Sequence, residues 1–235
     1  MDSNIKLGFS TGCCYKTISP ASKNATNIIL ETGSNSIELC FIKIERLDTE
    51  ILKNDLRKFS HISIHAPTDN IIYKDNKETK IILDKLDMLN KSLGSNYMVF
   101  HPDTVDDFSI FEKYEFNTVF ENMDNRKKSF QTVNEFKILF EKHPKLNMVL
   151  DLNHCLSNDD TFELAYNFWN NFKDKIKYFH ISGFVNNYHY PLFDSNQDFI
   201  IDFIKDKNLP VIVESLFENE KDFKKELNYI ESTIK

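Results

Sequence analysis

The sequence has few cysteines, the residues whose disulfides stabilise small secreted proteins. It also has no apolar run long enough to cross a membrane. Its four cysteines, at positions 13, 14, 40 and 155, form no CxxC pair and no zinc-ribbon spacing. In a chain of 235 residues this pattern argues against a disulfide framework. The first residues also lack a basic segment followed by an apolar one. We therefore expect a soluble, cytoplasmic protein with no membrane partner.

The chain also lacks an excess of positive charge. It carries 36 acidic and 29 basic residues, a formal net charge of −7 and an isoelectric point of about 5.5. This balance does not indicate an overall affinity for nucleic acid, although it leaves room for a local basic patch. The length suits one domain over residues 1–235 and is close to the roughly 250 residues of a typical (β/α) barrel.

Short apolar segments alternate with helical patterns along the whole chain. The clearest helix is Lys77 to Leu93, where apolar residues recur at helical spacing before Gly94 ends the pattern. Predicted strands are Leu7–Ser10, Ser36–Cys40, Ile62–His65, Met98–His101, Val119–Glu121, Met148–Asp151, Tyr178–His180 and Val211–Glu214. The other predicted helices are Ala21–Thr32, Leu47–Phe59, Asp107–Tyr114, Phe130–Lys142, Asp159–Phe172, Phe199–Lys205 and Phe217–Ile234. An irregular loop is expected from Val185 to Asp194. Eight alternating units favour a closed parallel (β/α)8 TIM barrel over an open sheet.

Six of the predicted strands end in a residue that can bind a metal ion. These residues, separated by 20 to 36 positions, are His65, His101, Glu121, Asp151, His180 and Glu214. In a parallel barrel the carboxyl ends of all strands meet at one mouth, where the catalytic residues of such enzymes lie. The six side chains are therefore expected to share one pocket.

Three imidazoles and three carboxylates form a nitrogen and oxygen site for zinc, manganese or iron. Six ligands exceed what one tetrahedral ion uses, and a carboxylate can bridge two ions. A pair of ions suits the hydrolysis of a phosphate ester. One ion held by Glu121, Asp151, His180 and Glu214 would instead suit isomerisation or epimerisation of a sugar, with a carboxylate moving the proton. A non-catalytic barrel that binds ligands through the same residues is a third possibility.

The set resembles the xylose isomerase-like barrel superfamily, and most closely its endonuclease IV branch of apurinic-site endonucleases. The similarity runs through His65-Ala66-Pro67, Phe100-His101-Pro102, Glu121-Asn122, Asp151-Leu152-Asn153-His154, His180-Ile181-Ser182 and Glu214-Ser215, about two-thirds of the chain. The resemblance implies that His65 and His101 hold one metal ion and that Glu121 bridges. It also implies that Asp151, His180 and Glu214 hold a second ion, with a sugar phosphate or abasic DNA as partner. Glu121-Asn122-Met123-Asp124 also resembles the corresponding strand of the ultraviolet-damage endonucleases.

The sequence departs from both branches of that superfamily. Endonuclease IV completes a third site with the histidine of its Asp-x-x-His motif, here His154, and with an Asp-x-His after the seventh strand. Here Asn187 stands in place of that aspartate, ahead of His189. The sugar isomerases often carry an arginine shortly after the seventh-strand histidine, and Gly183 to Asn186 contains none. The histidine pair His65 and His101 favours the phosphate-ester reading over the isomerase.

Other residues near the predicted mouth are candidates for catalysis or for substrate binding. Glu121, Glu214 and His154 are the candidate catalytic groups, and His154 and His189 are candidates for a third metal or for substrate. Arg126 offers a planar fork of donors to a phosphate, and Lys16 is a weaker candidate for the same role. Glu38, on the second strand, is expected to pair with a base inside the barrel mouth or to contact substrate.

Overall fold

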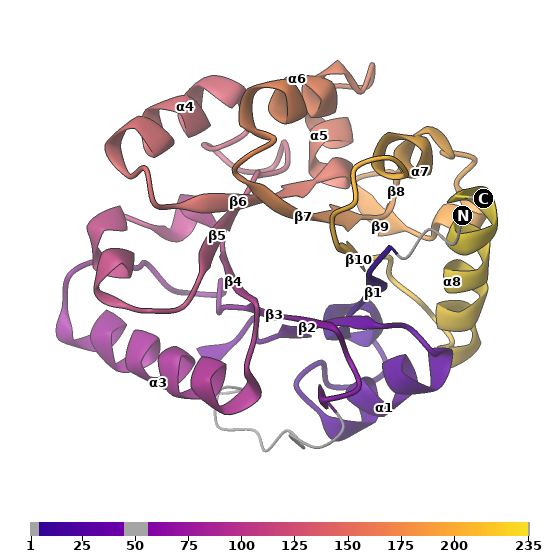
Figure 1. The fold of residues 1–235 in the computed structure, drawn as a ribbon, viewed down its shortest axis with the longest axis horizontal. Coiled ribbons are helices and arrows are strands. Elements are labelled where there is room, and N and C mark those ends of the chain that lie inside the picture. The colour runs from indigo at the N-terminus through magenta and orange to yellow at the C-terminus, as the bar shows by residue number, and fades with distance from the viewer. Residues whose placement is uncertain (1–4, 45–55, 235) are drawn as a thin grey trace.

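Eight parallel strands form a closed barrel in the computed structural model, which describes residues 5–44 and 56–234 (Figure 1). The ring order is β1-β10-β7-β6-β5-β4-β3-β2, so each strand pairs with its neighbours in sequence and β1 pairs with β10. The strands are β1 (Leu7–Ser10), β2 (Ser36–Cys40), β3 (His61–His65), β4 (Tyr97–Phe100), β5 (Thr118–Glu121), β6 (Asn147–Asp151), β7 (Ile176–Ile181) and β10 (Val211–Val213). The predicted barrel and its eight strands are confirmed.

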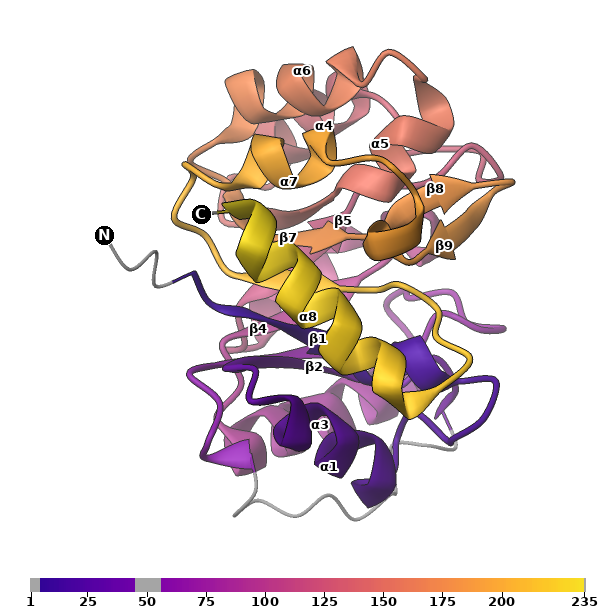
Figure 2. The ribbon, with the colours of Figure 1, turned by 90° about the vertical axis from the view of Figure 1, so that its right-hand side faces the viewer.

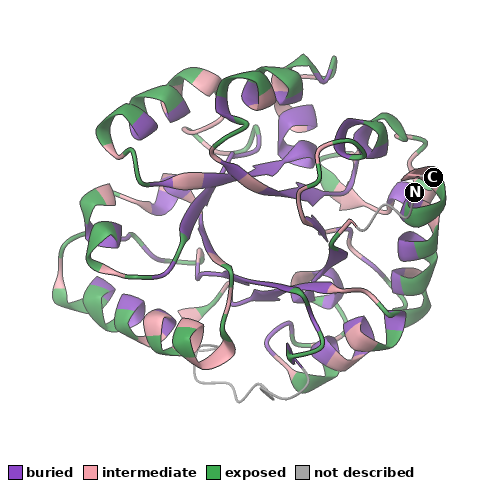
Figure 3. Ribbon diagram, in the orientation of Figure 1, coloured by how far each residue is buried: buried purple, intermediate pink, exposed green. Residues whose placement is uncertain are grey.

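Helices surround this ring, with buried inner faces and exposed outer faces (Figure 3). They are α1 (Lys23–Thr32), α3 (Lys77–Leu93), α4 (Val133–Lys142), α5 (Leu152–Asn158), α6 (Glu163–Phe172), α7 (Phe199–Ile204) and α8 (Glu220–Ile234). Side-chain caps fix several helix starts, as where the Asn76 carboxamide oxygen accepts the Thr79 amide at the start of α3. Gly33 and Gly94 end α1 and α3 in the left-handed conformation.

Three of the sequence predictions for the connections, and one helix that was not predicted, need comment. The predicted helix from Leu47 to Phe59 lies mostly outside the described residues. The predicted helix from Asp107 to Tyr114 is a 3-10 helix, η4 (Phe108–Lys113), and α5 was not predicted. The expected irregular loop from Val185 to Asp194 is wrong, because it contains most of an antiparallel hairpin of β8 (Gly183–Val185) and β9 (Tyr188–Tyr190), followed by the 3-10 helix η5 (Leu192–Asp194).

The hairpin is possible because two asparagines occupy its turn. Val185 pairs with Tyr188, so Asn186 and Asn187 are the only connecting residues, and both have positive φ angles of 51° and 63°. A two-residue turn of this kind requires positive φ at both positions, which asparagine tolerates better than most residues. The hairpin stands at the end of the barrel toward which β1 runs (Figure 2). It therefore flanks the mouth.

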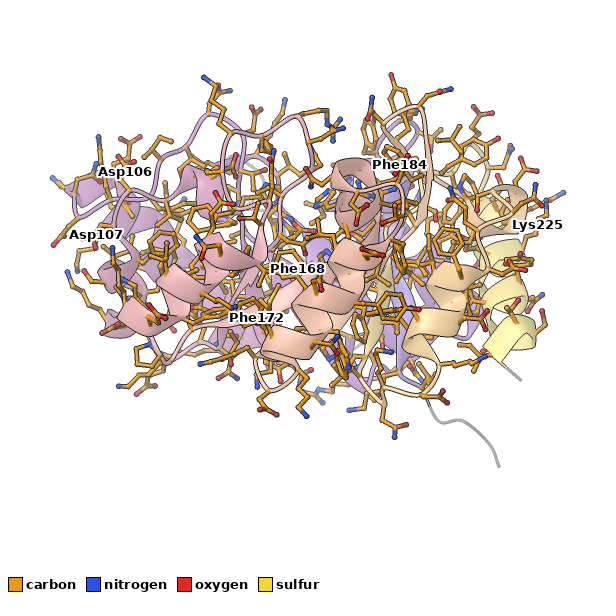
Figure 4. The ribbon with its side chains drawn as sticks, turned by 90° about the horizontal axis from the view of Figure 1, so that it is seen from above. Asp106, Asp107, Phe168, Phe172, Phe184 and Lys225 are labelled. Atoms are coloured by element: carbon orange, nitrogen blue, oxygen red, sulfur yellow. The ribbon has the colours of Figure 1, made fainter. Side chains whose placement is uncertain are left out.

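Alternation along the strands divides the apolar residues into two cores. The inner core fills the barrel and consists of Val99, Val119, Val149, Tyr178 and Ile212, each fully buried, with Tyr97 packed against it. A far larger outer core lies between the barrel and the helices. Phenylalanines supply much of this outer layer. Phe168 and Phe172 of α6 pack on Phe136 of α4 with ring centroids 5.5 and 6.4 Å apart (Figure 4).

All four cysteines are buried, and they form no disulfide among the described residues. No helix among the described residues has both the length and the apolar character needed to cross a membrane.

We predict that Gly8→Ala severely destabilises the fold because β1 and β2 approach each other closely there. An added Cβ would lie 1.7 Å from the backbone oxygen of Ser36. We expect the free energy of unfolding to fall by about 3 kcal/mol or more, the upper part of the range for overpacked sites. Gly94→Ala is the control, since its Cβ meets nothing within 4 Å and costs only left-handed strain. Chemical denaturation of both variants measures the difference, and equal losses would contradict the prediction.

Candidate metal centre

The six predicted ligands gather at the carboxyl ends of their strands. His65, Glu121 and Asp151 end β3, β5 and β6, His180 lies in β7, and His101 and Glu214 directly follow β4 and β10. Their ligand atoms fall into two groups within which all atoms lie within 4.8 Å of one another. One group is His65, His101 and Glu121, and the other is Glu121, Asp151, His180 and Glu214. Glu121 belongs to both.

The two oxygens of Glu121 face different histidines. Oε2 lies 2.9 Å from His101 Nε2 and 3.6 Å from His65 Nε2. Oε1 lies 2.8 Å from His180 Nδ1. The carboxylate itself is 1 % exposed, so these imidazoles are its main polar surroundings. One carboxylate thus faces two separate donor groups, as a bridging ligand would.

A third group consists of Asp151, His154 and His189, also within 4.8 Å of one another. Asp151 is the N-cap of α5 and accepts the backbone amide of His154, which fixes that histidine at the first turn of the helix. The hairpin brings His189 to the same place, with its ring centroid 5.4 Å from that of His154. Asn187, which replaces the aspartate expected by resemblance, lies in the hairpin turn.

Three histidines of the cluster have a hydrogen-bond acceptor for their second ring nitrogen, whereas His101 has none within hydrogen-bond distance among the described residues. His65 Nδ1 donates to the Ala66 carbonyl at 3.0 Å, and His154 Nδ1 donates to the Asn122 carbonyl at 2.8 Å. His180 Nε2 donates to Glu38 Oε2 at 3.1 Å. His101 Nδ1 lies 3.9 Å from Asp103 Oδ1.

This pattern is the one that metal-binding histidines require. A proton held on the outer nitrogen leaves a lone pair on the inner nitrogen, and the acceptor also fixes the ring orientation. His65 Nε2 and His101 Nε2 lie 3.2 Å apart. Two nitrogens bound to one tetrahedral zinc ion at 2.0–2.1 Å are separated by roughly 3.3 Å. The donor set therefore fits a divalent metal ion.

Several buried polar atoms in the cluster have no hydrogen-bond partner among the described residues. They include Asp151 Oδ2, His101 Nδ1 and Glu38 Oε1. Asp151 is 1 % exposed, so its free oxygen has lost water without gaining a donor. A cation beside Asp151 Oδ2 would remove that penalty.

The electrostatics of the cluster reflect crowded carboxylates. Burial and the negative charge of Glu121 raise the pKa of Asp151 well above its usual value. Burial, together with Glu121, Glu38 and Asp151, likewise raises the pKa of Glu214 to about 7, against the opposing charge of His180. Burial would also raise the pKa of Glu121, but the surrounding imidazoles, above all His180, hold it well below its usual value. The carboxylates of Asp151 and Glu214 therefore lack a compensating positive charge, which a bound cation would supply.

Burial and the neighbouring His154 lower the pKa of His189 to about 3. This imidazole is therefore neutral near pH 7, the form in which histidine binds metal ions.

The cluster opens into a cavity of about 270 Å³ at the barrel mouth. His65, His101, Glu121, His154, His189 and Glu214 line it, whereas Asp151 and His180 lie behind them. Four of these six side chains are predicted ligands. The other two, His154 and His189, were named from the sequence as candidates for a third metal or for substrate. His189 depends on the hairpin.

The predicted substrate-binding residues have other partners or other places. Arg126 lines the cavity, but its guanidinium is held by Asp124, with Nε 3.0 Å from Oδ1 and Nη2 2.6 Å from Oδ2. Lys16 lines a neighbouring cavity rather than this one. Glu38 is completely buried and accepts hydrogen bonds from Ser63, Tyr178 and His180. Its expected pairing with a base inside the mouth is therefore observed, and its carboxylate does not line the cavity.

Three residues with a clear place in the cluster were not singled out from the sequence. Asn122 donates to the Asp151 carbonyl and accepts the Asp151 amide, so it ties β5 to β6. Asp124 pairs with Arg126 and lies 3.8 Å from His154 Nε2. Asp103 pairs with Lys127 at 2.9 Å and faces His101. Their proximity in sequence to Glu121 and His101 is the signal that could have identified them.

Comparison with solved structures extends over nearly the whole chain. D-allulose 3-epimerase from Methylomonas sp. superposes with a TM-score of 0.70 at 15% identity, covering 97% of this chain and 98% of that chain. A xylose isomerase domain containing protein from Salmonella typhimurium gives 0.69 at 12%, covering 97% of both chains. Endonuclease IV from Thermus thermophilus gives 0.68 at 14%, covering 91% of this chain and 93% of that chain. No protein-family model and no curated protein sequence matches. The chain thus shares its barrel fold with this epimerase, with the xylose isomerase domain containing protein and with the endonuclease.

Proposed function

We propose that this chain is a divalent-metal-dependent enzyme that hydrolyses a phosphate ester with two metal ions at the barrel mouth. The observation that supports it is the placement of Glu121, whose two oxygens face two different histidine groups within 3.6 Å. If the enzyme used only the ion held by Glu121, Asp151, His180 and Glu214, the histidine pair His65 and His101 would have no metal to bind. Zinc, manganese and iron all suit this mixture of nitrogen and oxygen donors.

The ligands divide as the geometry groups them. His65, His101 and Glu121 would hold one ion, and Glu121, Asp151, His180 and Glu214 would hold the other. When bound, such a pair of ions polarises the phosphoryl oxygens and makes a bound water acidic enough to attack phosphorus. Asp151, His154 and His189 form a third candidate metal position, which has Asp151 in common with the second.

The chain's own residues then position and protonate the reacting groups. Glu214 lines the cavity and can accept a proton from the attacking water at its carboxylate. His154 keeps its Nδ1 proton on the Asn122 carbonyl, which leaves Nε2 free to take up a proton from solvent and pass it to the leaving oxygen. Asp124 positions Arg126 at the rim, where its remaining donors can contact a phosphate. The candidate substrates are a sugar phosphate and an abasic site in DNA.

A second candidate function is the isomerisation or epimerisation of a sugar with one ion. The observation in its favour is that Glu121, Asp151, His180 and Glu214 form a complete four-residue set without His65 and His101. Proton transfer between neighbouring carbons would exchange substrate hydrogen with solvent. Under the hydrolysis proposal, ketose and aldose sugars incubated with metal-loaded protein in D₂O gain no carbon-bound deuterium. Mass spectrometry tests this, and incorporation would support the isomerase instead.

The double variant His65→Ala, His101→Ala is predicted to lose one of two bound ions. Elemental analysis of the metal-loaded protein should give two ions per chain before the change and one after it. Hydrolysis of p-nitrophenyl phosphate should fall on the order of 10²-fold or more, as when one stabiliser of transition-state charge is removed. His143→Ala is the matched control because His143 pairs with Glu112 at the surface, away from the cluster. One ion in both proteins, with unchanged hydrolysis, would contradict the proposal.

Glu38 is predicted to strengthen metal binding without touching the metal. Glu38→Ala removes the acceptor for His180 Nε2, so the ring loses its fixed orientation and the apparent affinity for Zn²⁺ should fall about 10- to 100-fold. Ser63→Ala is the control, because it removes only the 2.8 Å hydrogen bond from Ser63 to the same carboxylate. Competition with a chromogenic chelator measures both variants, and thermal unfolding checks that each is folded. Equal Zn²⁺ affinity in Glu38→Ala and the unchanged protein would refute the role.

A further inference from the structure

A second cavity, of about 440 Å³, adjoins the metal centre. The hairpin forms one wall, and the segment that follows Glu214 contributes another. His189 and Leu216 line both cavities, so the second cavity lies directly beside the first. Its volume lies within the range of about 300–1,000 Å³ that is common for small-molecule sites.

A buried hydrogen-bond network fixes the walls of this cavity. Glu226 of α8 is fully buried, and its carboxylate accepts the backbone amides of Leu192 and Phe193 at 2.9 and 3.0 Å. The same carboxylate accepts the Ser215 hydroxyl at 2.6 Å. The Leu216 amide donates to the His189 carbonyl at 2.9 Å, which joins the two walls directly. The cavity is therefore preformed.

The lining of the cavity combines aromatic rings with carboxylates. Tyr188 lines the cavity and is 60 % exposed, so its ring is accessible to a ligand. Tyr190 donates its hydroxyl to Asp194 at 3.0 Å, which orients that carboxylate. Asp194, Glu218 and Asp222 outnumber Lys16, the lysine among the described lining residues. A second phosphate would meet this excess of negative charge, whereas sugar hydroxyls could donate to the carboxylates while the sugar ring stacks on an aromatic face.

We propose that this second cavity binds the uncharged, hydroxyl-rich part of the substrate, a sugar ring, while its phosphate lies at the metal centre. The inference rests on the proposed phosphate-ester hydrolysis for the phosphate end, but the sugar site itself requires no metal. It assigns the substrate to the sugar phosphates. A DNA strand would place further phosphates against Asp194, Glu218 and Asp222.

The first test measures sugar binding without turnover. Saturation-transfer NMR with methyl β-D-glucopyranoside and metal-free full-length protein should show transfer to the ring protons. Tyr188→Ala should reduce it about fivefold or more, the scale of one lost stacking contact. Tyr166→Ala is the matched control, an exposed tyrosine of α6 that lines neither cavity and should leave the transfer unchanged. Absence of transfer, or an equal loss in both variants, would overturn the proposal.

The second test compares substrates with metal-loaded protein. Tyr188→Ala should raise KM for glucose 6-phosphate about fivefold or more, whereas the control Tyr166→Ala should leave it unchanged. If the aryl phosphate is hydrolysed but KM for glucose 6-phosphate is unaffected, the sugar site fails and the proposed hydrolysis stands. If the sugar binds but no ester is hydrolysed, the proposed function fails and the site stands. Preferred cleavage of a duplex oligonucleotide with one abasic site, slowed by Tyr188→Ala, would overturn the sugar class.

Discussion

The candidate metal centre depends on burying negative charge inside a closed barrel. Two unit charges about 4.8 Å apart repel by roughly 3 kcal/mol at the effective dielectric of a protein site. The ligand atoms of Glu121, Asp151 and Glu214 all lie within that distance of one another. Their burial is tolerable only because imidazoles, backbone amides and, in our proposal, cations lie between them. Glu121 contributes most to this compensation, because it faces His65 of β3, His101 directly after β4 and His180 of β7.

Barrel closure is what makes this arrangement possible. The inner core of valines, with Tyr178 and Ile212, fills the barrel below the cluster and keeps water from reaching the carboxylates from beneath. On the side of β2 and β3 the interior is polar instead, and Glu38 there is bonded by Ser63, Tyr178 and His180. The polar side thus supports the ligand histidines, while the apolar side excludes solvent. The two halves of the interior contribute differently to the same centre.

The barrel and the convergence of the six candidate ligands at its mouth could be predicted because both depend on local patterns. A run such as Ile62-Ser63-Ile64 specifies a strand, and parallel closure then brings His65 to the mouth whatever the rest of the sequence does. His189 could only be named as a candidate, because its place depends on a hairpin whose turn contains two asparagines with positive φ instead of glycine. Likewise α5 begins directly after the predicted strand, whose last residue Asp151 is a ligand candidate and the N-cap of the helix at once.

Partner choice within the mouth could not be predicted from the sequence. A strand-end carboxylate indicates that a charge lies in the barrel, but not how deep it lies. Glu38 lies two residues before the end of β2, opposite Ser63 of β3, whereas Glu121 is the last residue of β5. Arg126 was expected to face a phosphate, and Asp124, two residues away, holds its guanidinium. Such pairings depend on loop geometry that periodicity does not encode.

The acidic net charge of the chain is compatible with a mouth that offers positive charge at the metal position and negative charge in the cavity beside it. A substrate phosphate needs positive charge at one point, and the ligand histidines with their ions would supply it locally without a basic surface. Beside that point, the cavity formed by the hairpin and the segment after Glu214 presents carboxylates and tyrosines, which suit hydroxyl groups and not a chain of phosphates. A nucleic-acid enzyme would need the opposite charge there. The local electrostatics therefore favour a small sugar phosphate over DNA, even though the ligand pattern resembles endonuclease IV.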